Sequence, residues 1–247
     1  MENRPVISLT SRSPAPGSDL EVYERYLKWQ NEVYYPMVMK VQEPTGLDSY
    51  QIIGEHPEYP LSTSILHCKN LKELGTYAVS LEGTAIVQEY KSWTDRGIIE
   101  LVWSGAYALI KSFRVKTSPA ASEDTRIQNA PVLHLEAYRL SQEEQSKYVK
   151  WFNDYGYRIF LPLFMKLPGF AGYDWYEFTG FRRYQTTREL ENPKYLSLIY
   201  FENYDDYVSY ARGPELAGFQ KVMRNVFPLG LNFKWYVQYQ LVKSWRK

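Results

Sequence analysis

Helical and strand-like hydrophobic patterns follow one another in the same order twice along the chain. In the first half, Tyr26, Trp29, Val33 and Met37 recur at three- and four-residue spacing, which predicts one face of a helix. Asp19 precedes this helix and Asn70 precedes a second one, and both residue types favour helix N-caps. The elements expected are strand 6–12, helix 20–41, strands 47–55 and 62–69, helix 70–93 and strand 98–114. The second half is expected to contain strand 132–140, helix 142–167, strands 172–181 and 195–202, helix 204–226 and strand 231–243.

Identical residues recur between the two halves at nearly constant offsets. Tyr26-x-Lys28-Trp29 returns as Tyr148-x-Lys150-Trp151, and the triplet Gly46, Asp48 and Tyr50 returns as Gly172, Asp174 and Tyr176. The sequence therefore predicts two ferredoxin-like βαββαβ repeats, 1–115 and 131–247, joined by a polar linker, 116–130. Each such sheet has helices on one face only, so two tandem duplicated units are expected to form an intrachain α+β barrel. Residues kept in both halves, such as Asp48 and Asp174, are expected to serve the fold.

Composition narrows the function classes. The formal net charge is +1, which gives no electrostatic footprint for nucleic acid or an anionic membrane. No apolar run approaches the length of a membrane span, and the N-terminal residues lack the apolar segment of a signal peptide, so a soluble cytoplasmic protein is expected. The one cysteine, Cys68, excludes an internal disulfide. The 23 tyrosines suit wet cavities and subunit interfaces, which also makes a homodimer an expectation.

One segment of the second half carries a family resemblance. Pro162-Leu163 at the end of the aromatic-rich helix, followed by Leu167-Pro168-Gly169-Phe170, resembles the EthD-like and antibiotic-biosynthesis-monooxygenase-like (ABM-like) families of dimeric α+β barrels. The later segment 207–219 is similar to the second helix of these families. The resemblance implies the barrel fold and small-molecule chemistry. Many EthD-like members have a histidine two residues before the Pro-Leu pair, where this chain has Phe160, so chemistry that depends on that histidine is not carried over.

The strand 132–140 presents candidate acid–base residues. Strand alternation places His134, Glu136 and Tyr138 on one face, which we expect to line the barrel interior, and Leu133, Leu135 and Ala137 on the face that meets the helices. A histidine with a carboxylate two residues away can act as a general base with a partner. The alternative is a hydrogen-bonded pair at a wet interface.

Further candidates lie on the helix and strand that follow. Trp151, Tyr155 and Arg158 fall at i, i+4 and i+7, so they could reach a cavity mouth, where a guanidinium suits a carboxylate or enolate oxygen. The alternative is that the two aromatic residues belong to the core and that Arg158 is solvated. Tyr173 and Trp175 could form the wall of a site for a flat apolar ligand.

The three histidines, His56, His67 and His134, do not have metal-ligand spacing, and we expect no metal and no bound cofactor. The leading hypothesis is a cofactor-independent oxygenase, cyclase or isomerase that acts on an aromatic, enolisable ligand. In it His134 is the base, Glu136 its orienter, and Tyr138 or Arg158 the oxyanion donor. The second hypothesis is a non-catalytic ligand-binding or assembly protein. The third is a haem protein, because chlorite-dismutase-like chains also consist of two such repeats and need a proximal histidine in the second half.

Overall fold

A computed structural model describes residues 3–54, 58–115, 131–139, 142–186, 192–214, 216–217 and 232–247. The first part contains β1 (Val6–Pro14), α1 (Leu20–Trp29), η1 (Gln30–Tyr34), α2 (Tyr35–Lys40), β2 (Pro44–Ile52), β3 (Ser62–Cys68), α3 (Leu71–Val79), α4 (Leu81–Asp95) and β4 (Ile99–Arg114). The second contains β5 (Val132–Arg139), α5 (Gln142–Trp151), η3 (Phe152–Phe160), α6 (Leu161–Phe164), β6 (Phe170–Phe178), β7 (Tyr195–Phe201), α7 (Tyr204–Arg212) and β8 (Asn232–Arg246). The predicted linker 116–130 and the predicted helix beyond residue 217 lie outside the described residues.

The eight strands of the described residues form a closed antiparallel barrel in the order β1-β3-β2-β8-β5-β7-β6-β4. The register is continuous in β1–β3, where Val6 lies opposite Cys68 and Arg12 opposite Ser62. It is also continuous in β5–β7, where Val132 lies opposite Phe201. The predicted α+β barrel of ferredoxin-like strand and helix order is confirmed.

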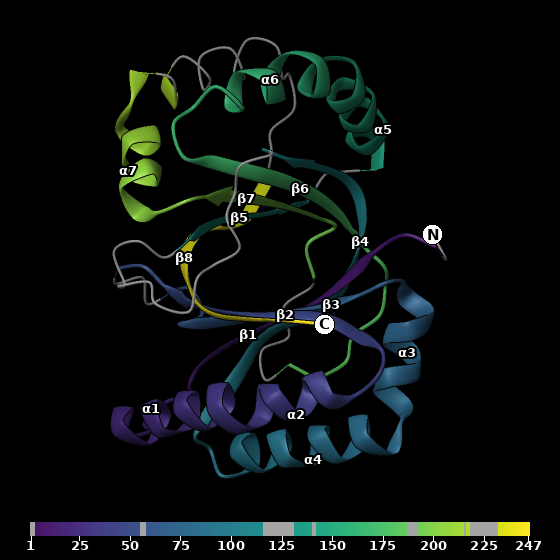
Figure 1. The fold of residues 1–247 in the computed structure, drawn as a ribbon, viewed down its shortest axis with the longest axis vertical. Coiled ribbons are helices and arrows are strands. Elements are labelled where there is room, and N and C mark those ends of the chain that lie inside the picture. Colours follow the sequence, from purple (N-terminus) through teal and green to yellow (C-terminus); the bar gives the residue numbers. More distant parts are fainter. Residues whose placement is uncertain are drawn as a thin grey trace. The chain divides into compact units, whose positions relative to one another are not determined.

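The described chain divides into two compact units, which are treated separately below. Unit 1 contains the described residues of 1–110, 176–192 and 241–247, and unit 2 contains those of 111–175 and 193–240. In unit 1, α1, α2 and α4 cover one face of the sheet that includes β1, β2 and β3 (Figure 1). Among the described residues, no helix is both long and apolar enough to cross a membrane.

The predicted helix 20–41 forms, with a change of winding inside it. The Asp19 side chain accepts a hydrogen bond from the Glu21 N–H at 2.8 Å and caps α1, as its position predicts. Residues Gln30–Tyr34 then form one π-helical stretch, η1, before α2 resumes α-helical winding. Such stretches widen a helix locally and are frequent at functional sites.

The predicted helix 70–93 is wrong as a single element, because the chain breaks at Ser80. Its hydroxyl accepts a hydrogen bond from the Gly83 N–H at 2.9 Å and caps a new helix, α4. A Cβ atom at Gly83 would lie 1.8 Å from the Tyr77 carbonyl oxygen, so only glycine fits this close approach. The predicted cap at Asn70 is confirmed, since its side chain accepts from the Glu73 N–H at 2.9 Å.

Unit 2 repeats this arrangement with a longer π-helical stretch. Its long helix consists of α5, η3 and α6, and η3 has nine residues where η1 has five, a difference of 9 − 5 = 4. Asn203 caps α7 by accepting from the Asp206 N–H at 2.9 Å, as Asn70 does for α3. In the predicted Leu-Pro-Gly turn, Gly169 has a φ of +67°, a backbone conformation that favours glycine.

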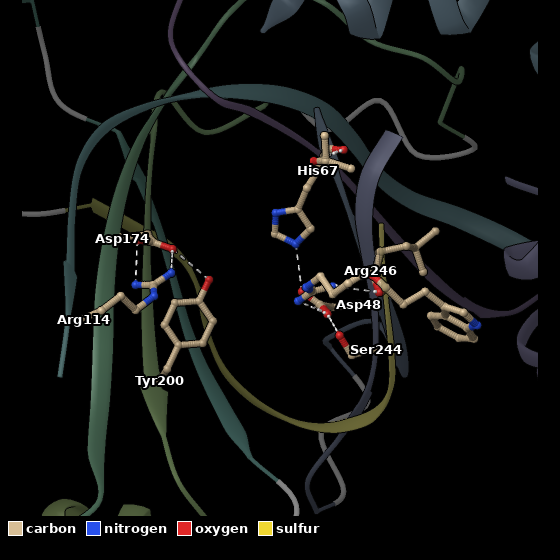
Figure 2. A network of polar contacts seen from close by, with 10 residues as sticks. Asp48, His67, Arg114, Asp174, Tyr200, Ser244 and Arg246 are labelled. Atoms are coloured by element: carbon tan, nitrogen blue, oxygen red, sulfur yellow. Dashed lines mark hydrogen bonds and ion pairs between the residues drawn. The ribbon is translucent and has the colours of Figure 1, made fainter. Parts of the chain in front are cut away.

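The two aspartates matched between the halves each bind the end of a long strand (Figure 2). In unit 1, Asp48 on β2 accepts from Ser244 on β8 at 2.6 Å and pairs with Arg246. In unit 2, Asp174 on β6 accepts from Ser112 on β4 at 2.6 Å and pairs with Arg114. Both carboxylates therefore join strands across the sheet, which is a structural role of the kind expected for residues kept in both halves.

Candidate functional site

The candidate residues of β5 lie on the face of the sheet that the helices cover. The Tyr138 hydroxyl is 2.6 Å from that of Tyr148 on α5, and the His134 ring stacks on Tyr207 of α7 with centroids 5.9 Å apart. The expectation that this face is turned away from the helices is therefore wrong. The alternation of apolar residues did not identify the covered face, because residues on both faces of β5 are buried. The polar side chains on the helix-covered face are buried with hydrogen-bond partners, among them tyrosine hydroxyls.

His134 is held on both ring nitrogens. It is 1% exposed, and its Nδ1 lies 2.9 Å from the Gln238 amide nitrogen on β8, which donates to it. Nε2 therefore carries the proton and donates to Oε1 of Glu136 at 3.3 Å. The ring of Tyr236 packs edge-on against the imidazole, 4.4 Å between centroids. These contacts fix both the orientation and the tautomer of His134.

Glu136 is a partly buried carboxylate that lies close to tyrosine side chains. Its side chain is 22% exposed, and in the described part of the chain His134 is its only ion-pair partner. Burial, and then the negative charge of Glu136, raise the pKa of Tyr236 to about 12, and the same two causes raise the pKa of Tyr210 further. These phenols are therefore protonated at neutral pH and can donate hydrogen bonds beside the carboxylate.

A chain of hydroxyl groups runs beneath α5. The Tyr173 hydroxyl lies 2.9 Å from Ser197 Oγ, which lies 3.4 Å from the Tyr138 hydroxyl, next to Tyr148. Burial is the main reason that the pKa values of Tyr138, Tyr148 and Tyr173 are raised. The structure thus brings the predicted residues Tyr138 and Tyr173 into one polar network.

The other predicted residues lie around or outside this network. Trp175 is fully buried, with its ring 4.2 Å from that of Phe152. Trp151 stacks between Tyr148 and Tyr155, and Tyr155 is 37% exposed. Arg158 is exposed on η3 and contacts none of the described candidate residues through a hydrogen bond or ion pair.

Sequence reasoning missed Gln238, Tyr207, Tyr210 and Tyr236. Gln238 lies directly opposite His134 in the β5–β8 register, a pairing of residues 104 positions apart. Strand alternation does place Tyr236 and Gln238 on one face of β8, which is the only sequence signal for them. Their meeting with His134 depends on the register, which the sequence does not specify.

A metal or haem does not fit the described histidines. His134 uses both ring nitrogens in hydrogen bonds, so it offers no lone pair to iron without losing Gln238. His67 bonds Asp48 at 2.8 Å through Nε2, and His56 lies outside the described residues. Within the described ranges, no three histidine, cysteine, aspartate or glutamate side chains converge as a metal site would require.

Comparison with solved structures finds proteins that share this α+β barrel fold over nearly their whole length. An anthrone oxidase-like protein is 9% identical, with a TM-score of 0.64 and coverage of 99% of this chain and 94% of that one. A proposed monooxygenase from Fusobacterium nucleatum is 11% identical, with a TM-score of 0.65 and coverage of 100% and 96%. A point mutant of chlorite dismutase from Candidatus Nitrospira defluvii is 11% identical, with a TM-score of 0.59 and coverage of 98% and 93%.

These identities show a shared fold and do not assign a reaction. No family model and no curated protein sequence matches the chain. The chain therefore has the α+β barrel fold found in monooxygenase-like and chlorite-dismutase-like proteins.

Proposed function

We propose that the chain is an enzyme that removes a proton from an aromatic, enolisable small molecule, with Glu136 as the general base. The observation that carries this proposal is the Glu136 carboxylate itself. It is partly shielded from water, no lysine or arginine among the described residues pairs with it, and tyrosine side chains lie close to it. A carboxylate in such surroundings is available to accept a proton from a ligand.

The hydrogen bonds favour a division of roles opposite to the one expected from the sequence. His134 already accepts at Nδ1 from Gln238 and donates from Nε2 to Glu136, so it suits the role of orienter. Glu136 retains a second carboxylate oxygen for the substrate proton. His134 is thus a positioning residue and Glu136 the catalytic one in this proposal.

The proposed step transfers one proton and forms one enolate. The C–H bond next to the ligand carbonyl breaks, its proton moves to Glu136, and the electron pair shifts onto the carbonyl oxygen. Protonated tyrosine hydroxyls on this face, Tyr138 among them, are candidate donors to the enolate oxygen. Tyr173 and Trp151, which are partly exposed, supply aromatic surface for a flat ligand. The fully buried Trp175 supports this surface through Phe152, whose ring contacts both Trp175 and Tyr173. Arg158, exposed on η3, is retained only as a candidate for contacts at the mouth of the site.

The fold neighbours are compatible with this proposal. One is an anthrone oxidase-like protein, and an anthrone is an aromatic ketone with an acidic C–H bond. An enolate could next react with oxygen, close a ring or be reprotonated, which correspond to the oxygenase, cyclase and isomerase types. The same proposal includes four further features. They are descent from a duplicated repeat, a linker at 116–130 between the two repeats, a homodimer and a cytoplasmic location.

The test measures the proton transfer alone, so that it does not depend on the later step. Anthrone is incubated with the protein in D₂O, and NMR follows the loss of its C10 proton signal. We expect Glu136→Gln to slow the exchange by about 10²–10⁴-fold. Glu89→Gln, the same chemical change at an exposed position of α4, is the matched control and is expected to exchange at the wild-type rate.

The same experiment separates the enzyme from a binding protein. Anthrone that binds the wild-type protein without faster exchange would support the non-catalytic alternative. Exchange that is equally fast in wild type and Glu136→Gln would contradict the assignment of the base.

A further inference from the structure

Unit 1 contains a small cavity on the helix-covered side of its sheet, between the strands and the helices η1 and α2. Its lining includes Thr10, Arg12, Tyr35, Ser64, Arg183 and Tyr184. The cavity measures about 10 Å³, close to the size that holds a single water molecule. The space therefore admits a particle of about the size of one water molecule.

Arg12 brings a positive charge to this cavity without a negative partner. The side chain is among the largest fully buried ones, at 2% exposed. Its Nε donates to the Tyr90 hydroxyl at 2.7 Å, Nη2 to Ser64 Oγ at 2.9 Å and Nη1 to the Thr10 carbonyl at 3.2 Å. All three acceptors are neutral, and across the described residues no carboxylate pairs with Arg12. A guanidinium does not lose its proton in proteins, and buried charges are normally paired.

The neighbouring tyrosines do not supply the missing negative charge. Burial raises the pKa of Tyr90 and of Tyr35, and this effect exceeds the lowering that the Arg12 charge causes. Both phenols are therefore neutral at physiological pH. The Tyr90 ring centroid lies 5.3 Å from the Arg12 guanidinium carbon, so an aromatic face attracts this charge, but no negatively charged side chain neutralises it.

Two further groups on the cavity wall have unused donors. The Tyr35 hydroxyl is buried beside the hydroxyls of Ser49 and Ser64, but no hydrogen bond of good geometry joins it to a described residue. Nε of Arg183 is also buried without a hydrogen-bond partner among the described residues, and Nη2 of the same side chain donates to the Tyr77 hydroxyl at 2.6 Å. No carboxylate in the described part of the chain pairs with Arg183 either. The cavity thus has two guanidinium groups on its wall, and one hydroxyl that makes no hydrogen bond of good geometry.

We propose that this cavity binds a monatomic anion of the chloride class. The wall offers donors and positive charge, which an anion requires, and the space is too small for a carboxylate or phosphate group. The bound anion is expected to neutralise Arg12 and to accept from Tyr35 and Arg183. Since the unfolded chain has no such site, the anion stabilises the folded protein by mass action.

The site is specific to unit 1. On β5, the alternating residues of the helix-covered face are His134, Glu136 and Tyr138, where β1 has Ser8, Thr10 and Arg12. Unit 2 therefore has Tyr138 in place of Arg12 and the carboxylate of Glu136 in place of Thr10, so we expect no anion there. The inference does not depend on the function proposed for unit 2.

Thermal unfolding tests the proposal in solution. The melting temperature is measured in increasing sodium chloride and in sodium gluconate at equal ionic strength, because gluconate is too large for the cavity. We expect a saturable rise in chloride above that in gluconate for the wild type. Tyr35→Phe removes a hydroxyl that makes no hydrogen bond of good geometry with its serine neighbours, so the variant should fold, and it should lose most of the chloride-specific rise.

The control is Tyr204→Phe, the same change at a ring that is 38% exposed on α7, which should keep the wild-type response. Equal melting temperatures in the two salts, or an unchanged chloride response in Tyr35→Phe, would overturn the proposal. Crystals of the wild-type protein in sodium bromide give a second readout. We expect an anomalous peak beside Arg12, and a water molecule without anomalous signal would sink the idea.

Discussion

Arg246 Nη2 lies 2.6 Å from Oδ1 of Asp48, at the end of a strand that begins more than 180 residues after that aspartate. The carboxylate also accepts from Ser244 at 2.6 Å and bonds His67 Nε2 at 2.8 Å (Figure 2). One buried aspartate therefore connects the last strand, β8, to β2 and β3. This arrangement makes part of the stability of unit 1 dependent on the ionisation of Asp48.

Replacing Asp48 by asparagine should lower stability in a pH-dependent way. Burial alone would raise the pKa of Asp48, but the bond with His67, the charge of Arg246 and the bond from Ser244 outweigh burial and hold it below its usual range. Because the folded-state pKa is the lower one, the stabilisation is present above the unfolded pKa of about 3.9 and is lost as pH falls through the folded value. We expect Asp48→Asn to cost about 1–2 kcal/mol at pH 7 and less near pH 3, as measured by urea unfolding.

Asp95→Asn is the matched control for this variant. Asp95 pairs with Lys91 on the surface of α4, where its side chain is 59% exposed, and removal of such a pair is expected to change stability by less than about 1 kcal/mol. A stability loss in Asp48→Asn that is the same at pH 3 and pH 7 would show that the carboxylate charge is not what stabilises the strand end.

The matched glycines Gly46 and Gly172 should differ in how much stability each loses when it is replaced by alanine. A Cβ at Gly172 would lie 2.7 Å from the Phe113 carbonyl oxygen, which belongs to the backbone and cannot move aside cheaply. A Cβ at Gly46 would lie 3.0 Å from the end of the Arg246 side chain, which can shift. We expect Gly172→Ala to cost about 1–3 kcal/mol and Gly46→Ala clearly less. Chemical unfolding of the two variants measures this order, and the reverse order would contradict the packing described.

Local patterns were sufficient to predict much of the fold. Asp19, Asn70 and the Leu-Pro-Gly turn at Gly169 act through neighbours within a few residues, and each was placed correctly from the sequence. The break at Ser80 was missed because serine also occurs inside helices, and the decisive contact is the close approach of Gly83 to Tyr77. The π-helical winding of η1 and η3 was not predicted, because the hydrophobic spacing was compared only with the α-helical period.

The candidate site was less predictable, because it depends on long-range register. Strand alternation grouped His134, Glu136 and Tyr138 correctly, but it does not say which side of the sheet the helices cover. The usual rule that apolar residues meet the helices failed at β5 and also at β1, where Arg12 lies on the covered face. Gln238, which determines the tautomer of His134, reaches it only through the pairing of β5 with β8.

The turn at Gly169 predicts a strong effect of a single methyl group. Its φ of +67° disfavours other residues, and a Cβ there would lie 2.0 Å from Oδ2 of Asp206. We expect Gly169→Ala to cost about 1–3 kcal/mol because backbone strain and displacement of Asp206 add together. Thermal or urea unfolding measures the loss.

Gly180→Ala separates the two contributions. Gly180 has a φ of +86° and nothing within 4 Å of an added Cβ, so this variant carries the backbone cost alone, about 1 kcal/mol. If Gly169→Ala were no more destabilised than Gly180→Ala, the contact with Asp206 would not contribute.

The tautomer of His134 is the most direct prediction for the candidate site. Gln238 donates to Nδ1, so the neutral imidazole should carry its proton on Nε2. The chain has three histidines, so ¹⁵N NMR of the labelled protein can assign each ring and its protonated nitrogen. We expect the Nε2–H form for His134 at neutral pH.

Gln238→Leu removes the donor to Nδ1 and should let the Nδ1–H form become populated. Glu136→Gln is the control, because Gln238 still donates to Nδ1 and the amide oxygen of the new side chain still accepts from Nε2. An Nδ1–H tautomer in the wild type would mean that His134 does not donate to Glu136, and the proposed orientation of the base would then lose its support.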